Sequence, residues 1–328
     1  MSISPKIWVL VDDVIGNSNQ ALELAKKISD DSEIKKISYN KFAKLPNIFL
    51  GLFPMHIKKS TLNDLLANDP PEIIICAGRR LAALAVYLKK IFAKNEQREV
   101  KLIQIMKPDL SPKKFDLIIL PQHDNFNYVL PNIIRIIGSL HNIKDKIVNT
   151  ESQFKSTYPS MQNFIAVIIG GSNKNYNFKI QDARKMVKSL KEVSRKKSLK
   201  LLVTFSRRTP ELVKQYIKNN VLSPHIIYCP SNEDYNPYPT MLSKAQYIIT
   251  TPDSVSMCSE AVGTGTPVYI YNLPNFVSTK HNYFIQQLMD LGVAKQFDDN
   301  TQTLESYNYT PLNELDRVAK LIKENLLG

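Results

Sequence analysis

The chain has 328 residues, 43% of them apolar, which suits two domains of about 150 residues better than a single core. It contains no run of about 18 uncharged apolar residues and no typical signal peptide, so we expect a cytoplasmic protein without a transmembrane helix. The three cysteines lie far apart and lack metal-ligand spacing, which argues against a disulfide framework and a zinc site.

The net charge of +13 bears on the choice of partner. Such a charge favours an anionic membrane surface, acidic glycolipids or nucleic acid, unless it reflects a coding bias toward Lys, Asn and Ile. The sequence has no basic face interleaved with aromatic residues and no nucleic-acid-binding motif, so we expect no nucleic-acid partner. An anionic membrane surface, at the inner face of the cytoplasmic membrane, is the favoured alternative.

Residues 1–150 alternate between predicted strands and helices. Strands are expected at residues 6–12, 34–38, 72–77, 100–106 and 115–120, and helices at 21–28, 81–92 and 132–141. This order predicts a Rossmann-like domain built on a parallel sheet. The apolar segment Ile48–Met55 is interpreted as core interrupted by Pro54, with an interfacial or acceptor-binding flap as the alternative.

Polar residues follow three of these strands, at the edge where a parallel sheet binds ligands. Asp12 and Asp13 end the first strand. Arg79 and Arg80 open the helix after the third strand, where two cations are unfavourable unless an anion or a carboxylate meets them. His123 follows the fifth strand and is a candidate acid or base, with a structural histidine as the plainer interpretation.

A polar stretch without periodicity, residues 143–162, contains the predicted linker. A second series of elements follows, with strands at 164–169, 201–205, 225–229 and 247–250, helices at 180–196, 283–291 and 312–327, and a rim loop at 236–239. We therefore expect an N-terminal domain at 1–150, a linker at 151–162, a C-terminal domain at 163–310 and a final helix at 311–328.

Two loops of the second domain have residues suited to an anionic ligand. Gly170-Gly171-Ser172 follows a buried strand, and its glycines would let backbone amides approach an oxyanion. Arg207 and Arg208 follow the next strand, where they match a diphosphate or a base. Neither a P-loop nor the dinucleotide fingerprint is present.

The stretch 248–271 predicts a strand, a turn, a helix of about ten residues and a second strand. Asp253, Ser254 and Ser256 supply oxygens suited to a helix start, whose amides and dipole favour an anion. Glu260 lies about two turns beyond Asp253, so we expect both on one face, with Glu260 placed to accept hydrogen bonds from a ribose diol. The alternative is a capped βαβ unit with a solvated Glu260.

Two Rossmann-like halves facing across a cleft, with a last helix returning to the first half, resemble the GT-B architecture of glycosyltransferases, and the stretch 248–271 looks like the donor-binding segment of the MurG-like branch. Nearly the whole chain is similar to the mitochondrial fission ELM family, including bacterial homologues described as glycosyltransferases. The motifs that carry this resemblance are Trp8-x-Leu10-x-Asp12, Gly16-Asn17, Gln20, Ala77-Gly78-Arg79-Arg80, Pro121-x-His123-Asp124, Gly170-Gly171-Ser172, Ser206-Arg207-Arg208-Thr209-Pro210 and Thr251-Pro252-Asp253-Ser254-Val255-Ser256-Met257. The chain departs from the family's pattern at Asp13, Val14 and Asp109, on the acceptor side.

The resemblance implies a role for each group of residues. The donor nucleotide-sugar would bind Gly170, Gly171, Ser172, Arg207, Arg208, Asp253, Ser254, Ser256 and Glu260. The catalytic base would be Asp12, Asp13 or His123, and the acceptor side or cleft would include Gly16, Asn17, Gln20, Arg79, Arg80 and Asp124.

The sequence therefore predicts a metal-independent glycosyltransferase with no cofactor, using a nucleoside-diphosphate sugar, favoured as uridine-linked, and a lipid-linked or envelope glycan acceptor. One rival is a non-catalytic adaptor, because plant relatives are associated with recruiting a dynamin-like GTPase to an organelle surface. Another is a nucleotide-sugar epimerase, which shares the fold and donor site. The sugar, the acceptor, the stereochemical outcome and the oligomeric state stay open.

Overall fold

The computed structural model describes residues 4–44, 54–95, 99–124, 129–173, 176–221, 225–229, 235–273 and 278–327. The chain divides into two compact units. Unit 1 comprises Met1–His141 and Glu314–Gly328, and unit 2 comprises Asn142–Asn313. Each unit is described by itself below.

Unit 1 contains a six-stranded parallel sheet in the order β2-β1-β3-β4-β5-β6. Its strands are β1 (Ile7–Val11), β2 (Ser32–Lys36), β3 (Ile73–Ala77), β4 (Lys101–Ile105), β5 (Leu117–Pro121) and β6 (Ile133–Ile136). Its helices are α1 (Ile15–Ile28), α3 (Lys59–Ala67), α4 (Arg79–Asn95) and α11 (Glu314–Ile322), with the short turns η1 (Lys41–Lys44), η2 (Pro112–Lys114) and η3 (Lys323–Leu327).

The side chains of β1 show how both faces of this sheet are covered. All five of its residues are buried, as expected for a continuous apolar run in a parallel sheet. Ile7 and Val9 pack into one core cluster with residues of α1 and α11, whereas Trp8 and Leu10 pack into another with residues of α4. The alternation of side chains along the strand thus builds two cores, one on each side of the sheet.

Unit 2 repeats this plan with a six-stranded parallel sheet in the order β12-β11-β10-β7-β8-β9. Its strands are β7 (Phe164–Ile169), β8 (Lys200–Phe205), β9 (His225–Tyr228), β10 (Tyr247–Thr250), β11 (Val268–Tyr271) and β12 (Ala294–Phe297). Its helices are α5 (Ile143–Thr157), α6 (Ile180–Lys197), α7 (Glu211–Asn220), α8 (Tyr238–Lys244), α9 (Val255–Val262) and α10 (Thr279–Asp290).

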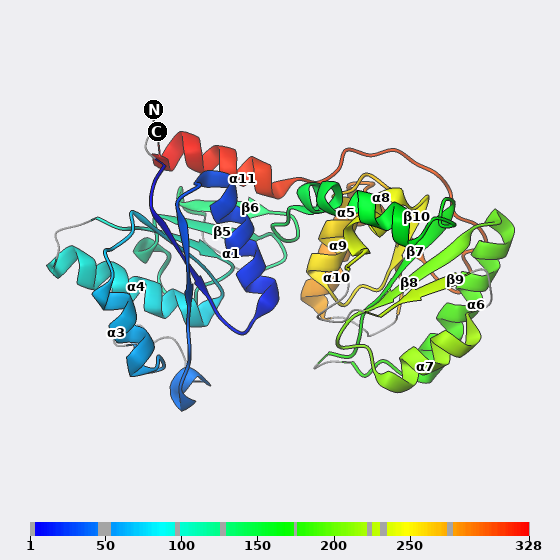
Figure 1. Cartoon of the computed structure of the whole chain (residues 1–328), viewed down its shortest axis with the longest axis horizontal. Helices are drawn as coiled ribbons and strands as arrows, with labels where there is room; N and C mark the ends of the chain where they lie inside the picture. The colour runs from blue at the N-terminus through cyan, green and yellow to red at the C-terminus, as the bar shows by residue number, and fades with distance from the viewer. Residues whose placement is uncertain are drawn as a thin grey trace. The chain divides into compact units, whose positions relative to one another are not determined.

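The C-terminal helix α11 returns to unit 1, as predicted, and lies alongside α1 (Figure 1). Leu315, Val318 and Ile322 are buried in the same core cluster as α1. Glu314 accepts a hydrogen bond from the amide of Ile137, which ties the start of α11 to the segment after β6.

Two expectations for the middle of the chain are wrong. Residues 132–141, predicted as a helix, contain the edge strand β6, because a short β-branched apolar run does not distinguish helix from strand by periodicity. The linker predicted at residues 151–162 overlaps α5, which ends at Thr157. Only Ile143 and Phe154 of α5 are buried, so the helix has no apolar stripe for the sequence pattern to reveal.

Three elements were not predicted: α3, α8, which begins in the expected rim loop, and the strand β12 with its Ala-Lys-Gln-Phe sequence. Of the segment Ile48–Met55, residues 48–53 lie outside the described residues. Within the ranges that the structure describes, no helix is both long enough and apolar enough to cross a bilayer.

Candidate functional site

In each sheet the strand order reverses at one point, the switch point, and the candidate site of that unit lies there. In unit 1 the order reverses between β1 and β3, and in unit 2 between β7 and β10. A parallel sheet binds ligands beyond the carboxyl ends of the strands at such a point, because the flanking loops diverge to opposite faces. The loops after β1, β3, β7 and β10, together with the helices that follow them, carry most of the residues predicted from sequence.

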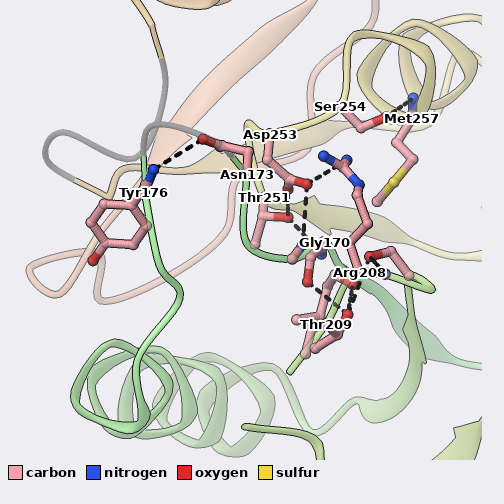
Figure 2. Close-up of polar contacts among 12 residues, drawn as sticks. Gly170, Asn173, Tyr176, Arg208, Thr209, Thr251, Asp253, Ser254 and Met257 are labelled. Carbon is pink, nitrogen blue, oxygen red and sulfur yellow. Dashed lines mark hydrogen bonds and ion pairs between the residues drawn. The ribbon is translucent and has the colours of Figure 1, made fainter. Parts of the chain in front are cut away.

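In unit 2 the side chain of Asp253, which is fully buried, organises the switch point. Its Oδ1 accepts from the Thr251 hydroxyl at 2.7 Å, and its Oδ2 accepts from the Gly171 amide at 3.1 Å and from Arg208 Nη2 at 2.9 Å. The Thr251 hydroxyl in turn accepts from the Gly170 amide at 2.7 Å. Figure 2 shows Gly170, Thr251, Asp253 and Arg208 gathered at this point.

The two glycines have a different role from the predicted one. Their amides donate to Thr251 and Asp253, so these two donors are already used within the protein. A β-carbon at Gly170 would overlap the carboxylate of Asp253, and one at Gly171 would overlap the backbone carbonyl of Arg208. The glycines therefore allow three loops to approach closely, and the predicted contact of their amides with an oxyanion is not supported by this geometry.

The loop after β8 places Arg208 beside Asp253. The Thr209 hydroxyl donates to the carbonyls of Gly170 and Ile169 at 2.7 and 3.1 Å, which anchors the loop to the end of β7. Arg208 Nη2 contacts Asp253 while 48% of the side chain is exposed, so the rest of the guanidinium fork can meet a ligand. Arg207 is exposed on the same loop.

Helix α9 begins next to this network. The Ser254 hydroxyl accepts from the Met257 amide at 3.3 Å, and the Ser254 carbonyl accepts from the Cys258 amide at 3.1 Å. By helix geometry the amides of Val255 and Ser256 have no intrahelical acceptor. They supply the positive helix terminus predicted here, although α9 has eight residues instead of about ten.

Glu260 does not share the environment of Asp253, contrary to the expectation of a common face. Asp253 precedes the helix and points into the loops after β7 and β8, whereas Glu260 lies on α9 toward α5 and α8. Its carboxylate is 4.0 Å from Lys146 Nζ and 18% exposed. Burial and the neighbouring Glu260 raise the pKa of Tyr238 well above its usual value. The carboxylate thus lies near Lys146 and Tyr238 with limited exposure.

The Ser172 side chain is engaged within its own loop. Ser172 was predicted to face the donor, but its hydroxyl donates to Asn177 Oδ1 and accepts from the Phe178 amide, so it shapes its own loop.

A cavity of about 160 Å³ adjoins Pro252 at the ends of β11 and β12. Its lining includes four carboxamides that sequence reasoning missed, because they come from distant segments without a motif: Asn272, Asn282, Gln286 and Gln296.

In unit 1 the side chain of Asp12 is 4% exposed, and its carboxylate accepts three hydrogen bonds within the protein. Its Oδ1 accepts from the Val14 amide at 2.9 Å, and its Oδ2 accepts from the Tyr39 hydroxyl at 2.9 Å and from Arg80 Nη2 at 3.1 Å. Burial, then the nearby Asp12, raises the pKa of Tyr39. Arg80 also pairs with Asp13 at 2.6 Å, so these two carboxylates meet one of the two arginines at the start of α4.

Asp12, Val14 and Arg80 border a cavity of about 360 Å³ between the ends of β1 and β3. Asn17 and Arg79, two of the residues that the sequence predicts on the acceptor side, line it together with Asp12 and Arg80. Gly78 has a φ of +86°, and a β-carbon there would lie 2.7 Å from Asn17 Nδ2. Glycine therefore both permits the left-handed turn before α4 and admits the Asn17 amide.

The other predicted residues of unit 1 lie elsewhere or are engaged in the fold. His123 and Asp124 are buried after β5, three strand positions from β1, or roughly 14 Å by strand spacing alone. Gln20 is buried, where it accepts from the Leu140 amide and donates to the Gly16 carbonyl. Gly16 is exposed at the start of α1.

Within the described residues, no group of three or more His, Cys, Asp and Glu side chains is arranged to hold a metal ion. Groups suited to contact an anion at the two switch points include Arg208, Arg207 and the start of α9 in unit 2, and Arg79 with the starts of α1 and α4 in unit 1. Both sets lie at a switch point.

Comparison with known proteins gives relatives along nearly the whole chain. The family model described as Mitochondrial fission ELM1 matches residues 15–326. Uncharacterized protein RP120 of Rickettsia prowazekii (strain Madrid E) is 41% identical over 97% of each chain. Mitochondrial fission protein ELM1 of Arabidopsis thaliana is 25% identical over 79% of this chain, and the match spans 65% of that relative's length.

Solved structures with a similar fold include a UDP-GlcNAc 2-epimerase and a MurG protein. UDP-GlcNAc 2-epimerase from Methanocaldococcus jannaschii has a TM-score of 0.61 and 13% identity, covering 98% of this chain and 100% of that one. MurG of Acinetobacter baumannii has a TM-score of 0.52 and 14% identity, covering 98% and 94%. The fold is thus of the GT-B type, with two α/β units that each contain a parallel sheet. By its sequence match over nearly its whole length, the chain belongs to the mitochondrial fission ELM1 family.

Proposed function

We propose that the protein is a glycosyltransferase that binds a nucleoside-diphosphate sugar in unit 2 and an acceptor in unit 1. The observation that carries the proposal is the arrangement of Arg208, held by the buried Asp253, next to the amides that open α9. A fixed guanidinium and a helix N-terminus are complementary to a diphosphate. Both lie at the switch point of the sheet, where such a ligand is expected.

Other polar groups of unit 2 suit the rest of the donor. Glu260, partly exposed on α9, can accept two hydrogen bonds from a ribose diol. The cavity beside Pro252 has carboxamide donors and acceptors that match sugar hydroxyls or the edge of a pyrimidine. UDP-sugars are ligands of similar folds, since the M. jannaschii epimerase is described in complex with UDP-GlcNAc and UDP.

In this mechanism the protein's own dipoles stabilise the leaving diphosphate without a metal ion. Arg208 and the amides of Val255 and Ser256 would meet the negative charge that develops as the glycosidic bond breaks. A base must also take the acceptor's proton. Asp13 is the favoured base, because 74% of its side chain is exposed whereas Asp12 and His123 are buried. A lipid-linked or envelope glycan acceptor at the inner membrane face completes the proposal.

Two rival functions use the same fold. A non-catalytic adaptor is favoured by the match to a protein named for mitochondrial fission. A nucleotide-sugar epimerase is favoured by the epimerases among similar structures, and it would need no acceptor. Loss of the Glu260 carboxylate would leave an adaptor unaffected but would weaken either enzyme.

The proposal predicts that uridine diphosphate binds without added metal and that Glu260→Gln weakens this binding about tenfold, or about 1.4 kcal/mol, because the neutral amide is a poorer acceptor for the ribose diol. Calorimetric titration of uridine diphosphate measures the effect. Glu211→Gln, at the exposed start of α7, is the matched control and should leave the affinity unchanged.

Two outcomes would contradict parts of this proposal. Folded wild-type protein that binds no nucleoside diphosphate would favour the adaptor. Conversion of a UDP-sugar into its epimer in the absence of any acceptor would favour the epimerase. Thermal unfolding of each variant checks that a lost affinity does not come from a lost fold.

A further inference from the structure

We propose that the cavity between β1 and β3 in unit 1 binds the phosphate headgroup of a membrane lipid, and that an exposed apolar rim around it enters the membrane interface. The rim consists of Val14, Ile15, Phe42 and Met55. As the identity of an acceptor this inference rests on the proposed function, but as a lipid-binding site it depends only on unit 1.

The cavity has the size and the polar lining that a phosphate group needs. Its volume of about 360 Å³ can hold a phosphate group, and Asn17 and Arg79 line it. Helices α1 and α4 begin at its wall, and neither has an acidic residue in its first turn. Helix starts of this kind, next to an arginine, are complementary to a phosphate. Gly78 keeps the wall open by admitting the Asn17 amide.

Two carboxylates lie near this cavity and must be accounted for. Asp12 and Asp13 both pair with Arg80, at 3.1 and 2.6 Å. The Asp12 carboxylate is buried and also accepts from Tyr39 and from the Val14 amide. Arg80 therefore compensates one of the two charges, whereas Asp13 is 74% exposed and does not line the cavity. Arg79 at the exposed mouth adds a second cation to the wall.

The four residues of the rim are between 39% and 55% exposed. Hydrogen bonds fix the backbone of three of them, Val14, Phe42 and Met55. Asn40 donates to the Met55 carbonyl at 2.8 Å and accepts from the Phe42 amide at 2.9 Å. Val14 donates to Asp12, which contacts the neighbouring Tyr39. Val14 also lines the cavity, so rim and cavity are continuous.

The charges beside the rim indicate which partner covers it. Lys41, Lys58 and Lys59 are exposed and lie next to rim residues along the chain or at the start of α3. Apolar side chains flanked by lysines suit the interface of an anionic membrane. A free phosphate would account for the cavity but not for the rim. A phosphate-headed lipid accounts for both features.

The test is co-sedimentation of the full chain with vesicles of phosphatidylcholine, with and without phosphatidic acid. We expect binding to the mixed vesicles to exceed binding to phosphatidylcholine alone. Arg79→Ala should lower the partition coefficient about fivefold through loss of one cation near the anionic surface. Phe42→Ser should lower it about tenfold through loss of the inserted ring.

Matched controls separate this site from the general effect of the net charge. Arg195→Ala removes an exposed arginine from the end of α6, and Leu212→Ser removes an exposed leucine from α7. Both should keep wild-type partitioning. Equal losses in the controls and the site variants would overturn the proposal, as would full competition by inorganic phosphate, which would identify a site for free phosphate.

Titration of uridine diphosphate into the same variants distinguishes a failure here from a failure of the proposed function. Arg79→Ala and Phe42→Ser lie in unit 1 and should bind the nucleotide like the wild type. Normal nucleotide binding with unchanged vesicle binding in both variants would overturn only the lipid site. Vesicle binding that follows the expected pattern, in a protein that binds no nucleotide, would overturn only the transferase.

Discussion

Gly171→Ala is expected to lower the free energy of unfolding of unit 2 by about 3 kcal/mol. The added β-carbon would overlap the Arg208 carbonyl, and that backbone is held in place by the hydrogen bonds of Thr209 to the end of β7. Relief would require the loops after β7 and β8 to separate, which would also break the bond from the Gly171 amide to Asp253. Differential scanning calorimetry should show a lower transition temperature.

Gly16→Ala is the matched control for this prediction. A β-carbon at Gly16 would have no atom within 4 Å, and the residue lies in the first turn of α1. The substitution should change stability by no more than about 0.5 kcal/mol, in the stabilising direction, because alanine loses less backbone entropy in a helix than glycine. Equal effects of the two substitutions would contradict the close approach of the loops in unit 2.

These glycines also mark what the sequence could and could not predict about the site. Buried strands such as β1 and β7 are continuous apolar runs, so the two sheets and their carboxyl edges follow from the pattern. The motifs lie at those edges because loops after parallel strands converge there. The location of both candidate sites can therefore be predicted from the sequence.

The hydrogen-bond partners of the site residues could not be predicted from the sequence, because they depend on contacts between distant segments. Gly171 and Asp253 are 82 residues apart, and no local rule indicates that the amide would donate to that carboxylate rather than to a ligand. The same holds for Asp12, whose burial by Tyr39 and Arg80 removes it from the favoured bases. Glu260 was placed by helix spacing from Asp253, but Asp253 lies outside the helix, so the spacing rule did not apply.

The buried position of Asp253 has a second large consequence. Asp253→Ala should destabilise unit 2 by about 3 to 4 kcal/mol, because the Gly171 amide and the Thr251 hydroxyl would lose their acceptor inside the protein. Asp253→Asn should cost less, since its single carbonyl oxygen keeps one of the three donors satisfied. Urea unfolding monitored by circular dichroism measures both. Asp290→Ala, at the exposed end of α10, is the control and should remain within about 0.5 kcal/mol of the wild type.

A double-mutant cycle with Arg208→Ala extends this prediction to the donor site. If Asp253 holds the guanidinium in place for a diphosphate, either substitution alone should weaken binding of uridine diphosphate, and the second should add little to the first. A coupling energy of about 1 to 2 kcal/mol in nucleotide binding would support that arrangement. Fully additive effects would mean that Arg208 meets the ligand without help from Asp253, and the buried carboxylate would then serve only to join the three loops.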